Sequence, residues 1–286
     1  MYHKNRRHLN DNWRFQFEEE AAEWVTLPHT WNALDTMEPD LTKRYRRGTG
    51  WYERKLEAGA ASCRRFVQFD AAAMTAEVWL DDVVVGSHVG GYTAFDVALP
   101  PAGGQLRVAV DNSPDTNLIP SDMSDFFLYG GLTRNVWLYE TGAVRLVKLH
   151  LVTEWEGDAA SLTLHGACDS FVEGTELVLQ LVDGGETAVF QSSYPLTSKN
   201  FTLDLPSIEN PQRWSPDNPA LYTLTAQLVC QGDPSDEVVE RIGFRTYQFP
   251  EGGPFYLNGE RLLLRGTHRH EDWAGLGSAV PDELSR

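Results

Sequence analysis

The sequence predicts an all-β protein built mainly from two β-sandwiches. Apolar residues recur at every second position in run after run, and no window of comparable length has them at helical spacing. Segments rich in Gly, Pro, Asp and Asn separate these runs. A strand with alternating apolar side chains places one face on a core and the other in water, which is typical of antiparallel sandwiches.

The expected strands follow from the alternation, in chain order. The clearest runs are residues 106–110, 147–151, 177–181, 201–205 and 222–228. Each has an apolar residue at its first, third and fifth positions, so each is expected to bury one face.

Two dipeptides predict tight hairpin turns. Asp81-Asp82 lies between Leu80 and Val83, and Asn258-Gly259 lies inside the final stretch of the chain. Asn, Asp and Gly tolerate positive φ, so both dipeptides are interpreted as structural rather than chemical. The hairpin around Asn258-Gly259 is expected to lead into a buried strand, residues 262–264.

Two seams divide the chain. One strand series ends near residues 140–143, and a Pro/Gly-rich link occupies residues 248–254. The predicted domains are therefore residues 1–142, 143–248 and 249–286. The first two have the size of domains.

Composition excludes several classes of function. The formal net charge of −17 argues against nucleic-acid binding, which needs a clustered positive surface. No apolar run approaches the roughly 18 residues of a membrane span, and no apolar stretch follows the basic N-terminus. We expect a cytoplasmic protein with no membrane partner, although a signal peptide could have been removed.

The three cysteines, Cys63, Cys168 and Cys230, lack metal-ligand spacing. Reduced thiols are the favoured interpretation, and a Cys168–Cys230 bridge within one sandwich is the alternative.

Nine tryptophans invite a carbohydrate-stacking interpretation. Those inside apolar strands, such as Trp79 and Trp137, are expected in the core instead.

Several stretches, in the same order along the chain, resemble glycoside hydrolase family 2, the family of β-galactosidases, β-glucuronidases and β-mannosidases. They are residues 9–15, 27–32, 50–54, 69–96, 129–138, 214–222, 242–245 and 255–273. The resemblance implies a jelly-roll sugar-binding sandwich at 1–142 and an immunoglobulin-like sandwich at 143–248. Residues 249–286 then resemble the truncated start of a (β/α)8 catalytic barrel, which needs about 250 residues.

The resemblance also points to two substrate-binding residues. Asp125 matches an aspartate that reaches from the jelly roll to the bound sugar, and a carboxylate can accept hydrogen bonds from two adjacent hydroxyls. The alternative is a solvated loop aspartate or a turn former. His270 matches a histidine that contacts the substrate at the end of a barrel strand. Metal binding by His268, His270, Glu271 and Asp272 is the alternative interpretation there.

The implied reaction is retaining, exo-acting hydrolysis of a terminal β-D-galactoside by two glutamates. No glutamate here matches either one, so both catalytic residues are expected beyond Arg286 and the chain alone is expected to be inactive. The resemblance implies no cofactor in this chain, and Mg²⁺ and Na⁺ in the full-length enzyme.

Two kinds of alternative stay open. β-Glucuronidase activity is the alternative within the family, because residues 125–129 look as much like that group. Outside enzymology, the chain could be a stand-alone carbohydrate-binding module or a scaffold for a homo-oligomer. The carbohydrate is the expected partner in every case except the scaffold.

Overall fold

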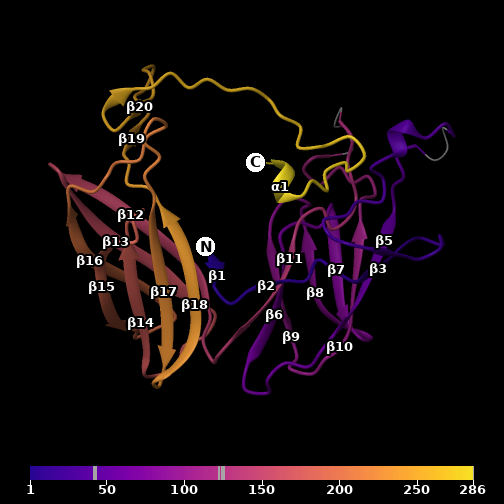
Figure 1. Cartoon of the computed structure of the whole chain (residues 1–286), viewed down its shortest axis with the longest axis horizontal. Helices are drawn as coiled ribbons and strands as arrows, with labels where there is room; N and C mark the ends of the chain where they lie inside the picture. The colour runs from indigo at the N-terminus through magenta and orange to yellow at the C-terminus, as the bar shows by residue number, and fades with distance from the viewer. Residues whose placement is uncertain (41–43, 122, 124–125, 286) are drawn as a thin grey trace. The chain divides into compact units, whose positions relative to one another are not determined.

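The computed structural model describes residues 1–40, 44–121, 123 and 126–285. It divides into two compact units, in each of which β-strands are the main regular secondary structure (Figure 1). Unit 1 comprises Met1–Asn5 and Thr141–His268, and unit 2 comprises Arg6–Glu140 and Arg269–Arg286. The prediction of an all-β chain with two sandwiches is confirmed.

Unit 2 is a sandwich of a six-stranded and a four-stranded antiparallel sheet. The six-stranded sheet has the order β4 (Glu23–Val25), β3 (Trp13–Phe17), β5 (Thr49–Leu56), β10 (Gly104–Asp111), β7 (Thr75–Leu80) and β8 (Val83–Val89). The four-stranded sheet has the order β2 (Arg7–His8), β11 (Val136–Thr141), β6 (Arg64–Phe69) and β9 (Phe95–Leu99).

Alternate residues of these strands form one core between the two sheets. The predicted run 106–110 lies in β10, where Leu106, Val108 and Val110 are fully buried. They pack in one cluster with residues of both sheets, among them Trp13, Phe15, Tyr52, Val67, Phe69, Val78, Val97 and Leu138.

Two tryptophans that were predicted to be core residues lie outside the core. Trp79 and Trp137 are only half-buried, because the buried neighbours on either side of each one take the inward positions of β7 and β11. Trp79 packs against Trp51, with ring centroids 5.4 Å apart. Trp137 lies under the Arg6 guanidinium and donates its indole N–H to Asp70 at 2.8 Å. The prediction relied on the apolar character of the two rings. The alternation of side chains along each strand gives the correct face instead, because residues next to an inward-facing residue point outward.

Unit 1 is a second sandwich. Its five-stranded sheet has the order β1 (Tyr2–His3), β18 (Asp233–Ile242), β17 (Tyr222–Cys230), β14 (Thr175–Val182) and β15 (Ala188–Pro195). Its three-stranded sheet has the order β12 (Leu146–Glu156), β13 (Ala159–Cys168) and β16 (Asn200–Glu209). The predicted strands at 147–151, 177–181, 201–205 and 222–228 are all confirmed.

The N-terminal strand β1 belongs to unit 1, which the sequence did not predict. Tyr2 and His3 pair with Val239 and Val238 of β18. The His3 ring lies 2.9 Å from Asp236, whose other carboxylate oxygen accepts the Leu146 N–H at 2.8 Å. Both side chains are buried, so this contact ties the first residues of the chain to the sandwich that forms from residue 141 onward.

Both predicted hairpin turns are confirmed. Leu80 pairs with Val83 across Asp81-Asp82, and Asp81 adopts a φ of 52°. Asn258 and Gly259 have φ values of 54° and 82° and join β20 (Tyr256–Leu257) to β21 (Glu260–Arg261). These strands form a small sheet with β19 (Tyr247–Gln248).

The buried strand predicted after this hairpin is wrong. Residues 262–264 have no strand structure, and Leu263 and Leu264 are 66% and 64% exposed. An apolar run becomes a buried strand only where neighbouring strands pair with it and cover it, and none among the described residues does so here.

Helices are few in the described part of the chain. They are the 3₁₀ turn η1 (Asp35–Met37) and the four-residue α1 (Asp282–Ser285), and no described helix has the length and apolarity to cross a membrane.

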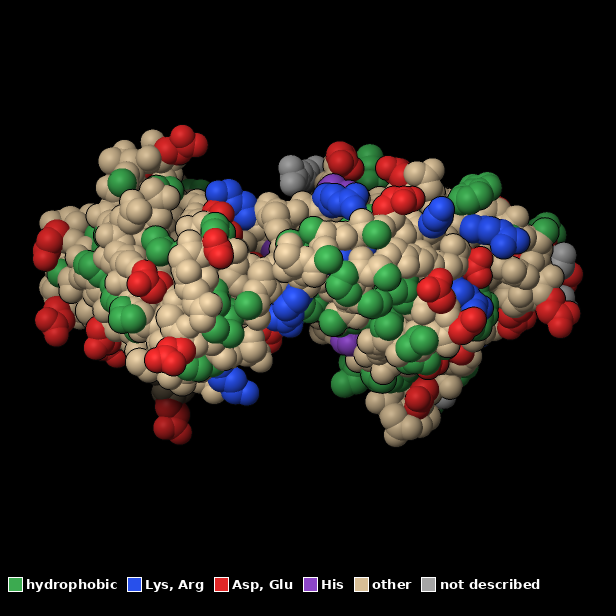
Figure 2. Space-filling view, turned by 90° about the horizontal axis from the view of Figure 1, so that it is seen from below, with side chains coloured by type: hydrophobic (Ala, Val, Ile, Leu, Met, Phe, Trp, Pro, Cys, Tyr) green, Lys and Arg blue, Asp and Glu red, His purple; other side chains and the backbone are tan. Residues whose placement is uncertain are grey.

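The three cysteines are free thiols, and burial raises the pKa of Cys168 to about 12. On the face seen in Figure 2, acidic side chains are spread among apolar and neutral ones rather than gathered in one patch.

Candidate functional site

One of the two predicted site residues is described. Asp125 lies outside the described residues, but Phe126, which follows it in the sequence, is described and 39% exposed. His270 is exposed, and its imidazole meets the Phe126 ring edge-on, with centroids 5.5 Å apart. Two segments separated by more than a hundred residues in the sequence therefore meet in unit 2, at the residue after Asp125.

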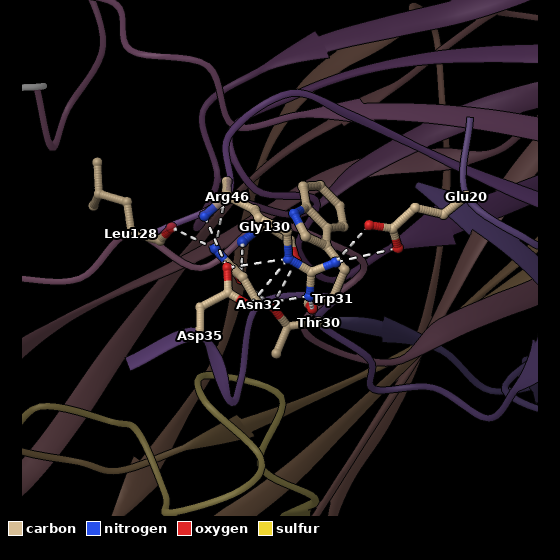
Figure 3. A network of polar contacts seen from close by, with 8 residues as sticks. All are labelled: Glu20, Thr30, Trp31, Asn32, Asp35, Arg46, Leu128 and Gly130. Carbon is tan, nitrogen blue, oxygen red and sulfur yellow. Dashed lines mark hydrogen bonds and ion pairs between the residues drawn. The ribbon is translucent and has the colours of Figure 1, made fainter. Parts of the chain in front are cut away.

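The chain that follows Phe126 is anchored by a buried amide (Figure 3). Asn32 is fully buried, and its Nδ2 donates to the Leu128 carbonyl and the Arg46 carbonyl, both at 3.3 Å. Its Oδ1 accepts the Gly130 N–H at 3.1 Å. The Thr30 hydroxyl lies 2.6 Å from the Gly130 carbonyl oxygen. One side chain thus fixes both ends of the segment 128–130, because it supplies donors and an acceptor at once.

An ion pair between a buried carboxylate and a partly exposed arginine holds the neighbouring loop in place. Arg46 contacts the Asp35 carboxylate through Nη2 at 3.0 Å and Nε at 3.1 Å, and Nη1 lies 3.2 Å from the exposed Glu20. Its Nη2 also donates to the Trp31 carbonyl at 2.5 Å. Asp35 is only 4% exposed, so the fork-shaped guanidinium provides the partner that this buried carboxylate requires.

Gly130 is a glycine for a steric reason. A Cβ at this position would lie 2.1 Å from the Trp31 ring, which is itself buried. The indole therefore packs directly on the backbone of the segment that follows Phe126. This close approach sets the distance between the backbone at Gly130 and the Trp31 ring beneath it.

A second polar chain fixes the next residues. The Leu132 N–H donates to the Tyr52 hydroxyl at 3.4 Å, and that hydroxyl lies 2.9 Å from Nδ1 of His29. Burial lowers the pKa of His29 to about 4, so its imidazole is neutral at pH 7. Nδ1 can therefore accept a hydrogen bond from the Tyr52 hydroxyl. Burial also raises the pKa of Tyr52, which keeps the hydroxyl protonated.

Residues 269–285 pack on this part of unit 2. A Cβ on Gly277 would lie 2.6 Å from the Tyr129 ring, so the backbone there lies directly against the aromatic face. Tyr129 donates to Asp272 at 3.4 Å, and Arg134 lies 3.4 Å from Glu271. Burial, followed by the Asp272 charge, raises the pKa of Tyr129. The Arg134–Glu271 pair is exposed and contributes little to stability, so backbone–aromatic packing holds this segment.

The groups gathered here are suited to binding a ligand that carries hydroxyl groups. They are an exposed imidazole, aromatic rings and carboxylates, which can pack on the C–H face of a ligand and exchange hydrogen bonds with its hydroxyl groups. Among the described residues, no group of three or more His, Cys, Asp or Glu side chains is arranged to hold a metal ion. Of the supporting residues, Thr30, Trp31 and Asn32 lie in one of the stretches that suggested the family, but nothing local in the sequence marks Asp35 and Arg46 as their partners.

Three comparisons describe what the chain is similar to. The sequence profile of "Glycosyl hydrolases family 2" matches residues 144–245. A protein of Formosa agariphila named "Putative beta-glucuronidase" is 36% identical over 93% of this chain and 33% of its own length. The β-galactosidase of Thermoanaerobacter pseudethanolicus is 28% identical over 97% of this chain and 39% of its own length.

Solved structures match the fold over almost the whole chain. The apo structure of Bacteroides uniformis β-glucuronidase 3 aligns with a TM-score of 0.88 and 34% identity, covering 99% of this chain and 40% of that one. The chain thus spans only a minor part of the length of each of these relatives.

Proposed function

Because the chain belongs to glycosyl hydrolase family 2, we propose that the protein is a retaining β-glycosidase that removes a terminal sugar. The observation that supports this proposal most is the structural similarity to a β-glucuronidase over 99% of the chain. In such a reaction one carboxylate forms a glycosyl-enzyme and a second acts as acid and then base, about 5–5.5 Å away. No residue of this sequence matches either carboxylate, so we expect the 286-residue chain by itself to hydrolyse no glycoside.

Residues 1–286 would then serve to bind and to position. In this proposal Asp125 and His270 contact the sugar, and Phe126 supports the imidazole from its edge. The buried Asn32 and the Arg46–Asp35 pair hold the segments around them. Such anchoring matters because a displacement of about 1 Å can cost a hundredfold in rate.

Two sugars are candidates for the substrate. β-Glucuronides are favoured by the names of the F. agariphila and B. uniformis proteins, which share 36% and 34% identity with this chain. β-Galactosides are favoured by the name of the T. pseudethanolicus protein and by the resemblance of residues 130–138 to β-galactosidases. The class proposed is therefore the β-glycoside.

The test compares nitrophenyl β-glucuronide with nitrophenyl β-galactoside. Two proteins are assayed side by side: the full-length protein encoded by the gene that contains this sequence, and the purified 286-residue chain. We expect the longer protein to hydrolyse one of the two and the chain to hydrolyse neither. Turnover by the chain, or inactivity of a longer protein on both sugars, contradicts the proposal.

His270 is tested by replacement in the active protein. We expect His270→Ala to lower kcat/KM by roughly 10- to 100-fold, the loss of one substrate contact that strengthens in the transition state. His268→Ala is the matched control, because His268 is also exposed and lies two residues away in the sequence. Equal kinetics for the two variants would remove His270 from the site.

A further inference from the structure

Two histidines face each other on the outer surface of the three-stranded sheet in unit 1. His150 of β12 and His165 of β13 are directly opposite in the antiparallel register. Their sequence neighbours Leu149, Leu151 and Leu164 pack on the core of unit 1, so by alternation both imidazoles point away from that core. The two rings are nearly parallel, with an interplanar angle of 22° and centroids 6.5 Å apart.

One imidazole of the pair is held in place by the third strand of the sheet. Thr202 of β16 is opposite His165, and its hydroxyl lies 3.0 Å from Nδ1 of that histidine. In the tautomer that donates from Nδ1 to this hydroxyl, the lone pair is on Nε2 of His165. Histidines that bind metal ions commonly have their second nitrogen fixed by a hydrogen bond of this kind. His150 is exposed, so its ring is free to rotate toward Nε2 of its neighbour.

The two side chains are close enough to share one metal ion. The Cβ atoms of directly opposite residues lie about 4.5–5.5 Å apart in an antiparallel pair. Imidazole nitrogens bind divalent zinc at about 2.0–2.1 Å, so two nitrogens on one ion lie roughly 3–4 Å apart. Rings with centroids 6.5 Å apart reach that separation when the exposed His150 side chain rotates. Among the described residues no third His, Cys, Asp or Glu completes a set, so water occupies the remaining positions.

The charge of the same sheet face favours a cation. The other ionisable residues that register and alternation place on this face are Lys148, Glu154, Glu156, Asp204 and Glu209. All five are exposed, and they carry one positive and four negative charges. Negative charge therefore predominates around the histidine pair, on a chain whose formal net charge is −17.

We propose that His150 and His165 bind one Cu²⁺ ion between β12 and β13. Imidazole suits copper, nickel and zinc, and the affinity of a given site for divalent metals of this row is highest for Cu²⁺. Copper is therefore the ion that this pair holds most tightly. β12 is the edge strand of its sheet, so an ion shared with β13 ties that edge to the central strand. The site does not depend on the proposed hydrolysis, because both histidines belong to unit 1 and the candidate sugar site belongs to unit 2.

The first experiment is electron paramagnetic resonance of the purified chain with sub-stoichiometric Cu²⁺. The hyperfine and modulation pattern of the bound ion counts the imidazole nitrogens that coordinate it. We expect two imidazole nitrogens, one from each histidine. The N-terminal amine and His3 are competing nitrogen donors at the start of the chain, but His3 is buried against Asp236. A spectrum of free Cu²⁺, of an ion with a single imidazole, or of an ion with backbone nitrogens overturns the proposal.

Variants then locate the ion, with affinities measured by competition against a copper-binding dye. We expect His150→Ala and His165→Gln each to weaken Cu²⁺ binding by roughly 10- to 100-fold, because each loses the gain from a second ligand on the same ion. His150 is exposed, so His150→Ala should keep the thermal midpoint of the parent chain without copper. His268→Ala is the control, because His268 is also exposed, belongs to unit 1 and lies outside the sheet. Parental affinity in His150→Ala, or an equal loss in His268→Ala, refutes the location.

Discussion

Replacing Asn32 with Ala tests whether one buried amide holds the segment after Phe126. The change removes the acceptor of the Gly130 N–H and a donor to the Arg46 carbonyl. The Leu128 carbonyl is less affected, because Asn112 Nδ2 also donates to it at 3.2 Å. Two orphaned backbone groups at about 1–3 kcal/mol each predict a loss of about 2–6 kcal/mol in the free energy of unfolding.

The loss should be confined to unit 2. Urea denaturation can be followed by hydrogen exchange of peptides from residues 48–56 in unit 2 and 222–230 in unit 1. A loss of about 4 kcal/mol lowers the unit 2 midpoint by about 2 M urea for an m-value of about 2 kcal/mol/M. Asn117→Ala is the control, because Asn117 is an exposed turn residue whose side-chain amide donates to the exposed Asp115. A shift in Asn32→Ala below about 1 kcal/mol would refute the reasoning.

Three further predictions follow from buried groups. The pKa of His29 is about 4 in the fold against an ordinary 6.5, so the unfolded state binds the proton first as pH falls. The free energy of unfolding of unit 2 should therefore be highest above pH 6.5 and should fall toward pH 4, by at most about 1.4 kcal/mol per pH unit. In urea titrations at each pH, the His29→Gln variant should show a smaller fall over this range. Gly130→Ala drives a methyl group into Trp31 and should cost at least about 2 kcal/mol, whereas a neutral result would show that the ring can move. Asp236→Ala removes the acceptor of the buried Leu146 N–H and should lower the free energy of unfolding of unit 1 by about 1–3 kcal/mol. The same peptides should show no change in unit 2.

The strands and tight turns could be predicted because their causes are local. An apolar residue at every second position identifies β10, β14 and β17, where the buried residues are those of the alternating series. Asp81-Asp82 and Asn258-Gly259 identify their hairpins because few residues tolerate positive φ.

Side-chain burial is harder to predict, because it depends on which face of the strand a residue occupies and on whether other strands cover that face. The apolar character of Trp79 and Trp137 predicts core positions, but buried residues flank each of them in its strand, so each ring lies on the opposite face. The apolar run that contains Leu263 and Leu264 predicts a buried strand, but burial of this run would require neighbouring strands to pair with it and cover it.

The supporting residues of the candidate site depend on contacts between distant segments. Asn32 meets Gly130 across 98 positions, and Tyr129 meets Asp272 across 143. No local pattern encodes such a pair in a single sequence. The resemblance to a family supplied the position of His270, and only the structure supplied Phe126 as its neighbour.

The pairing of β1 with β18 has a consequence for synthesis on the ribosome. His3 and Asp236 are 233 positions apart, so β1 emerges roughly 10–50 s before its partner strand at ordinary elongation rates of about 5–20 residues per second. The whole of the unit 2 sequence up to residue 140 is translated in that interval. We therefore expect β1 to be made well before β18 and to dock late, and a waiting strand of this kind can pair with the β18 of another copy instead of its own.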